Sequence, residues 1–178
     1  MFTRGVAVGK FAFTAAIVAL VTSMSSAISD DTVCSRPEFR QFDFWLGSWD
    51  VVDEKGNAAG QNSITLEHNG CAVIERWTSA KGGTGFSLNH FDPSSASWKQ
   101  HWVGLGLILE MSGGMQGKSM VLEGKLQYLA DSRATVLRGT WTPLPDGRVR
   151  QHFVESADQG KTWSPWFDGY YSKRAAKP

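Results

Sequence analysis

The feature that most restricts the fold is the pattern of residues 47–173, in which short runs of alternating apolar and polar residues are separated by turn-forming residues. Apolar and polar residues alternate within the runs, as expected for strands with one face toward a core. The separating segments contain glycine, asparagine, aspartate and proline, which favour turns. The predicted strands are Ser48–Glu54, Gln61–Glu67, Cys71–Thr78, Thr84–Phe91, Ser97–Val103, Leu107–Met111, Ser119–Leu129, Ala134–Thr142, Arg148–Glu155 and Thr162–Lys173.

Ten short strands joined by short links predict an all-β domain, an antiparallel up-and-down β-barrel of about ten strands. Closure into a barrel leaves no strand edge unpaired. The segment Arg36–Leu46, in which Phe39, Phe42 and Trp45 recur at three-residue spacing, predicts a short helix or 3-10 turn across one end. Barrels of this size can hold one small ligand, although side chains can also fill them.

Residues 1–27 have the organisation of a secretory signal peptide. Arg4 and Lys10 provide a positive start, residues 11–22 are uncharged and apolar, and the small residues Ser25, Ser26 and Ala27 follow. The apolar run is shorter than the roughly 20 residues that a spanning helix needs. We therefore expect cleavage after Ala27, one domain over residues 28–178, a periplasmic or secreted location, and no membrane span in the mature protein.

The composition excludes several classes of protein. With 18 basic and 17 acidic residues, the net charge of +1 excludes a nucleic-acid binder that works by bulk charge. Charged residues at 20% and hydrophobic residues at 42% exclude wholesale disorder. The two cysteines lack C-x-x-C spacing, but Cys34 and Cys71 can form a disulfide in an oxidising compartment. Two unpaired buried thiols are the alternative.

No metal-binding or catalytic motif stands out. The histidines, at positions 68, 90, 101 and 152, form no recognisable ligand pair, and G-x-S-x-G is absent. We therefore expect no metal and no cofactor. Haem held through His152, on the ninth predicted strand, is the alternative.

Polar residues that stand two positions from an aromatic residue on one strand predict a binding site. Side chains alternate along a strand, so Glu75 shares a face with Trp77, and Gln100 shares a face with Trp102. If these faces point inward, aromatic rings and a few polar groups line a pocket. If they do not leave a pocket, the rings simply fill the core. The predicted ligand-binding residues are Glu75, Trp77, Asn89, Gln100, Trp102, Arg138, Trp141 and Gln151.

Glu75 is the one carboxyl group among the predicted ligand-binding residues. A buried carboxyl without a basic partner has a raised pKa, so Glu75 is expected to be protonated, hydrated, or paired with Arg138 or Arg150. The first hypothesis is a binding protein for a small apolar or aromatic molecule, with no nucleic-acid partner. The alternatives are an isomerase or hydrolase that uses Glu75 as acid or base with Arg138 or Arg150 as electrophilic partner, and an envelope interaction protein with a filled barrel.

The segment from Ser156 to Trp163 matches S-x-D-x-G-x-T-W, the Asp-box hairpin of sialidases and propeller repeats. Asp158 is expected to accept backbone N–H groups, Gly160 to adopt positive φ, and Trp163 to cover the loop. A propeller needs several copies at a fixed period, and the sequence contains one. The motif therefore predicts a stabilised hairpin.

Gly47 and Trp49 open the first predicted strand, which resembles the corresponding motif of lipocalins. In that superfamily the tryptophan packs against a basic residue of the last strand, here Arg174 or Lys173.

From Pro37 to Tyr171 the chain resembles a family of secreted bacterial lipocalin-like, calycin-type barrels for which no reaction is established. The matching segments are FDFWLGSWDV, GCAVIERWTSAKGGTGFSLNHFDPSSASWKQHWV and TWTPLPDGRVRQHFVESADQGKTWSPWFDGYY. The resemblance implies an antiparallel barrel and a link between Cys34 and Cys71.

Overall fold

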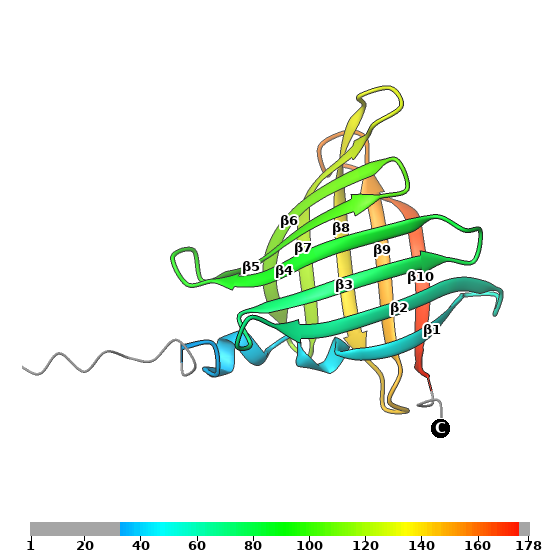
Figure 1. Ribbon diagram of the computed structural model, residues 1–178. Helices are drawn as coiled ribbons and strands as arrows, with labels where there is room; N and C mark the ends of the chain where they lie inside the picture. The colour runs from blue at the N-terminus through cyan, green and yellow to red at the C-terminus, as the bar shows by residue number, and fades with distance from the viewer. Residues whose placement is uncertain (1–32, 175–178) are drawn as a thin grey trace, which may run out of the picture.

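The alternating segments form ten strands that close into an antiparallel barrel in the computed structural model, which describes residues 33–174 (Figure 1). Each strand pairs with its neighbours in sequence, and the first strand pairs with the last. The predicted all-β, up-and-down barrel is therefore confirmed. The strands are β1 (Gly47–Asp53), β2 (Ala58–Glu67), β3 (Ala72–Ser79), β4 (Thr84–Asp92), β5 (Ser97–Gly104), β6 (Leu107–Gln116), β7 (Ser119–Tyr128), β8 (Ala134–Pro143), β9 (Val149–Ser156) and β10 (Ser164–Lys173).

Two strands are longer than the sequence pattern predicts. β2 begins at Ala58 rather than Gln61, and β6 continues to Gln116 rather than ending at Met111. Glycine is unfavourable inside strands, which is why the predicted sixth strand stops before Gly113. In the barrel, Gly113 pairs with Trp98 on one side and with Leu122 on the other. Pairing on both sides therefore extends the strand through its glycines.

The N-terminal segment crosses one end of the barrel as two 3-10 turns, η1 (Pro37–Arg40) and η2 (Asp43–Trp45) (Figure 1). A disulfide joins Cys34, just before η1, to Cys71 in the β2–β3 turn, which confirms the predicted pair. The Arg40 guanidinium also donates to the carbonyl oxygen of Gly70 in that turn. Within residues 33–174, no helix is long and apolar enough to cross a membrane.

A cluster of buried aromatic rings closes the barrel beneath these turns. Phe42 stacks on Trp45, with ring centroids 4.9 Å apart, and meets Trp141 edge-on at 5.3 Å. Trp98 meets Phe42 at 5.5 Å, also edge-on. All four side chains are buried from solvent. Such edge-to-face contacts add to the hydrophobic stabilisation, so this end of the barrel is a packed core.

Trp49 lies in the same cluster, where the first and last strands pair. Its indole N–H donates to the Trp45 carbonyl oxygen at 2.9 Å. The Lys173 ammonium nitrogen, on the paired position of β10, lies 4.2 Å from the centre of the indole, a cation–π contact. Of the two basic residues expected near Trp49, Lys173 therefore lies over the ring. Arg174 donates instead to the Trp49 carbonyl oxygen at 3.3 Å and to Asp50 at 3.0 Å.

Gly47 makes this contact possible. Its φ is +132°, and a Cβ atom at this position would lie 2.4 Å from the Lys173 ammonium nitrogen. Only glycine therefore leaves space for the lysine, whose ammonium group also donates to the carbonyl oxygen of Leu46.

The β9–β10 turn has the geometry of a self-contained hairpin loop. Asp158 accepts hydrogen bonds from the Thr162 hydroxyl at 2.7 Å, the Thr162 backbone N–H at 2.8 Å and the Ser156 hydroxyl at 2.8 Å. These bonds lower the pKa of Asp158 to about 2. Gly160 has a φ of +88°, and the Trp163 indole donates to its carbonyl oxygen at 3.1 Å. The polar groups of the motif are thus occupied within the turn.

The disulfide has a measurable thermodynamic effect. It closes a loop of 37 residues, so replacing both Cys34 and Cys71 with alanine should lower the free energy of unfolding by about 3–4 kcal/mol. Peptide mapping without reductant should recover the two cysteines linked. Two alkylatable thiols in the oxidised, folded protein would contradict the structure.

Trp49→Ala should destabilise the barrel by roughly 3–5 kcal/mol in chemical denaturation. The indole is fully buried and contacts Lys173 where the first and last strands pair. Trp163→Ala, which removes a partly exposed indole from the β9–β10 turn, is the matched control and should cost less. A loss below about 1 kcal/mol for Trp49→Ala would show that the ring does not support the closure.

Candidate ligand-binding cavity

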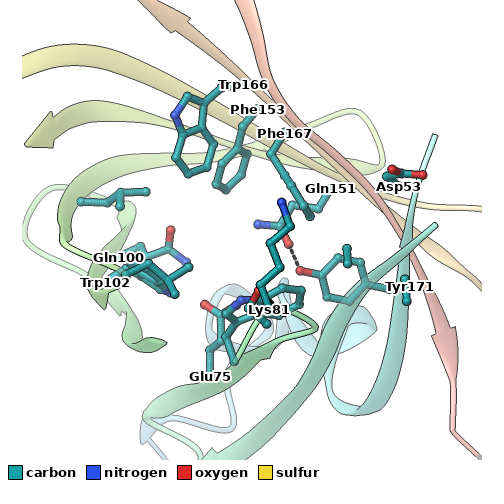
Figure 2. Close-up of a pocket in the computed structure, with 16 residues that line it drawn as sticks. Asp53, Glu75, Lys81, Gln100, Trp102, Gln151, Phe153, Trp166, Phe167 and Tyr171 are labelled. Atoms are coloured by element: carbon teal, nitrogen blue, oxygen red, sulfur yellow. Dashed lines mark hydrogen bonds between the residues drawn. The ribbon is translucent and has the colours of Figure 1, made fainter. Parts of the chain in front are cut away.

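The other end of the barrel contains a cavity of about 360 Å³. Asp53 at the end of β1, Lys81 in the β3–β4 turn and Leu105 in the β5–β6 turn lie around its mouth. Figure 2 shows Trp166, Phe153 and Phe167 together on one side of the cavity and Glu75 across from them. A cavity of this volume suits one small organic molecule.

Aromatic rings form most of the cavity wall. Phe153 stacks on Trp166 with centroids 5.9 Å apart, and it meets Phe167 at 6.3 Å. Trp77 meets Phe167 edge-on at 6.4 Å, so rings from β3, β9 and β10 form one surface. The aromatic lining residues are Trp77, Trp102, Phe153, Trp166, Phe167 and Tyr171.

Inward-facing glycines keep the two tryptophans of this wall out of the centre. A Cβ atom on Gly85 would lie 2.2 Å from the Trp102 indole, and one on Gly60 would lie 2.7 Å from the Trp77 indole. Each indole therefore lies against the backbone of a neighbouring strand, where any larger residue would displace it. This close approach leaves a hollow interior where the sequence alone allowed either a pocket or a filled core.

The floor of the cavity is polar and is organised around Glu75, whose side chain is buried. The Asn62 amide donates to one carboxyl oxygen at 2.7 Å, and the Ser87 hydroxyl donates to the other at 2.7 Å. Glu75 pairs with Ser87 across β3 and β4, and Asn62 lies on the adjacent β2. The carboxyl group is therefore held by a neutral donor from each neighbouring strand.

Further hydrogen bonds extend this network around the barrel interior. Gln100 on β5 donates to Asn89 at 2.7 Å, and Asn89 donates to Ser87 at 2.9 Å. On the other side, the Asn62 amide lies 3.4 Å from the Tyr171 hydroxyl, which donates to Gln151 (Figure 2). We call this set the polar network; its members are Asn62, Glu75, Ser87, Asn89, Gln100, Gln151 and Tyr171.

Burial raises the pKa of the Glu75 carboxyl, and the hydrogen bonds from Asn62 and Ser87 offset only part of the effect. Burial, together with the charge of Glu75, also raises the pKa of Tyr171 well above its ordinary value. No ion pair to Glu75 forms within the described part of the chain. Glu75 is thus the one carboxyl group on the cavity floor, and no basic side chain of residues 33–174 forms an ion pair with it.

Of the three alternatives considered for Glu75, pairing with Arg138 or Arg150 does not occur in the structure. Arg138 binds Glu123 at 2.7 Å and lies 4.2 Å above the Trp163 ring, on the outside of β8. Arg150 binds Asp168 at 2.6 Å on the outside of β9. Both arginines alternate with inward residues, so they face away from the interior. Arg138 is therefore not a residue of the cavity.

The structure brings together most of the other predicted ligand-binding residues. The residues Glu75, Trp77, Gln100, Trp102 and Gln151 line the cavity. Asn89 is buried behind Gln100 in the polar network, and Trp141 belongs to the aromatic cluster at the closed end. His152 alternates with Gln151 and Phe153, so it faces the outside of the barrel and not the cavity considered for haem. Within residues 33–174, no group of three or more His, Cys, Asp or Glu residues is placed to hold a metal ion.

Sequence reasoning missed Asn62, Ser87 and Tyr171 as members of the site, and Trp166 and Phe167 as part of its wall. Neither Asn62 nor Ser87 has an aromatic residue two positions away on its strand, which is the signal that identified the other polar residues. Their alternation with Ile64 and Asn89 was available, but only the strand register places them beside Glu75.

No protein-family model matches this sequence, and no curated protein matches it with significance. The fold and the cavity therefore define the class of protein: a closed, ten-stranded antiparallel β-barrel, consistent with a lipocalin-like fold, with a hollow, aromatic-walled interior.

Replacing Glu75 with glutamine tests the electrostatics of the floor. Because folding raises the pKa of Glu75 above about 4.5, its ordinary value, the native state keeps this proton to higher pH than the unfolded state. The wild type should therefore lose stability relative to Glu75→Gln as pH rises between those two pKa values, by up to about 1.4 kcal/mol per pH unit. Urea denaturation of both proteins from pH 4 to pH 8 measures the difference.

The matched control is Glu54→Gln, an exposed carboxyl in the β1–β2 turn, which should not reproduce this pH dependence. Parallel stability curves for wild type and Glu75→Gln would contradict the burial of the Glu75 carboxyl.

Proposed function

We propose that this protein is an exported, lipocalin-like binding protein that holds one small, largely aromatic or apolar molecule inside its barrel. The observation that supports this function best is the hollow interior itself, about 360 Å³ with an aromatic wall and a small polar floor. Binding sites for small molecules combine apolar walls, which supply most of the affinity, with few polar groups, which orient the ligand.

The acid–base enzyme alternative has less support in this geometry. Catalysis by Glu75 was expected to use an arginine as electrophilic partner, and both Arg138 and Arg150 face outward. The neighbours of the Glu75 carboxyl are instead amides and hydroxyls, held in the polar network. A hydrogen-bonded floor of this kind supports a role in orienting a ligand.

Export belongs to the same proposal. It rests on residues 1–27, which lie outside the described residues, and on membership of the secreted bacterial lipocalin-like family that the sequence resembles. The disulfide between Cys34 and Cys71 is compatible with a periplasmic or extracellular location, because such bonds persist in oxidising compartments.

The neutral fluorescent probe N-phenyl-1-naphthylamine tests the binding function. We expect saturable enhancement of its fluorescence, with one probe bound per barrel. Ser79→Phe places a ring on the inner face near the mouth, so it should weaken probe binding at least about tenfold, since it fills space that the probe needs.

Thr78→Phe is the matched control, because it adds the same ring at the next position of β3, on the exposed outer face. It should leave probe affinity unchanged. Absence of saturable binding to the wild type, or equal losses in the two variants, would contradict the proposed function. Native mass spectrometry of the protein purified from its own host then measures the mass of the retained ligand.

A further inference from the structure

We propose that the ligand is an organic amine, bound as its ammonium ion with the charged group against Glu75 and its carbon frame between the rings of the cavity wall. This inference rests on the proposed binding function and adds the charge and chemical class of the ligand.

The first argument is the open hydrogen-bonding capacity of Glu75. Each of its carboxyl oxygens accepts one hydrogen bond, from Asn62 or from Ser87, although each oxygen can accept two. Glu75 also lines the cavity, so a bound molecule can reach the remaining lone pairs. An ammonium group supplies several N–H donors and the positive charge that the protein does not provide.

The second argument is the charge around the cavity floor. The polar groups that face Glu75 come from β2, β4, β5, β9 and β10, and of these only the Tyr171 hydroxyl titrates. The pKa of Tyr171 is raised well above 10, so this hydroxyl is neutral at physiological pH. At the mouth, Lys81 and Asp53 carry opposite charges. The polar network therefore contains a single carboxyl group, and the one cation among the described residues that line the cavity, Lys81, comes from the β3–β4 turn and forms no ion pair with it.

This charge pattern discriminates between ligand classes. A buried carboxylate without a charged partner is unfavourable, and a cation that binds beside it relieves this cost. A ligand with its own carboxylate would place a second negative charge beside Glu75, with no basic residue on the floor to bind it. A neutral molecule would leave the Glu75 carboxyl without a charged partner.

The third argument is the chemistry of the wall. The faces of tryptophan and other aromatic rings attract cations, most strongly where water is excluded. Trp77 and Trp102 lie two positions further along their strands than Glu75 and Gln100 and on the same faces. Both indoles therefore line the cavity that the carboxyl group also lines. The combination of one buried acid and several aromatic rings is the composition that recognises an organic ammonium ion.

A matched series of probes with one phenyl frame tests the proposal. 2-Phenylethylamine, 2-phenylethanol and 3-phenylpropanoate compete for bound N-phenyl-1-naphthylamine at pH 7, and calorimetry measures each affinity directly. We expect the ammonium ion to bind at least tenfold more tightly than the alcohol, and the carboxylate to bind most weakly. An ammonium ion favours the ionised form of Glu75, so its affinity should rise as the pH increases through the raised pKa of this carboxyl group, whereas the affinity of the alcohol should not.

Glu75→Gln should lower the affinity for 2-phenylethylamine to that of the alcohol and abolish the pH dependence of amine binding, while N-phenyl-1-naphthylamine still binds. Glu54→Gln, which removes an exposed carboxyl outside the barrel, should behave as wild type. Tighter binding of the alcohol or the carboxylate, or an ammonium preference that persists in Glu75→Gln, would overturn the amine assignment. The binding function itself fails on different results: absence of saturable N-phenyl-1-naphthylamine binding to the wild type, or equal losses in Ser79→Phe and Thr78→Phe.

Discussion

The pairing of β1 with β10 is the contact on which the rest of this structure depends. It places Trp49 opposite Lys173, and the lysine ammonium lies over the indole because Gly47 leaves room for it. This pairing leaves no strand edge free, so every second residue of ten strands must face one interior. The character of those residues then decides whether the interior is packed, polar or hollow.

The interior of this barrel is packed at one end, polar in the middle and hollow at the other end. Aromatic rings around Phe42 and Trp141 fill the end beneath the 3-10 turns. The disulfide and the hydrogen bond from Arg40 join these turns to the β2–β3 turn of the barrel. The polar network forms the next layer. Above it, the glycines that face Trp77 and Trp102 allow large rings to line a space instead of occupying it. The change from packed core to cavity thus follows from where small residues stand opposite large ones.

Glu75 is the costly member of this arrangement. A buried acid with neutral neighbours loses its hydration, and the two hydrogen bonds from Asn62 and Ser87 compensate incompletely, which is why its pKa is raised. A leucine would fill the same position without this penalty. A perturbed carboxyl in a cavity is a feature of functional sites, since a stable fold alone does not require it.

The alternation of residues along the sequence determined the ten strands, the barrel class and the shared faces of Glu75 with Trp77 and of Gln100 with Trp102. It also misled where a strand continued through glycine, as in β6, and where Arg138, which faces outward, was predicted to bind the ligand. The polar network, the arginine-free floor and the hollow space were decided by the tertiary structure. The reason is physical: alternation is a local property with a two-residue period, whereas neighbours across strands depend on register and closure, which bring Tyr171 beside Asn62 from 109 positions away.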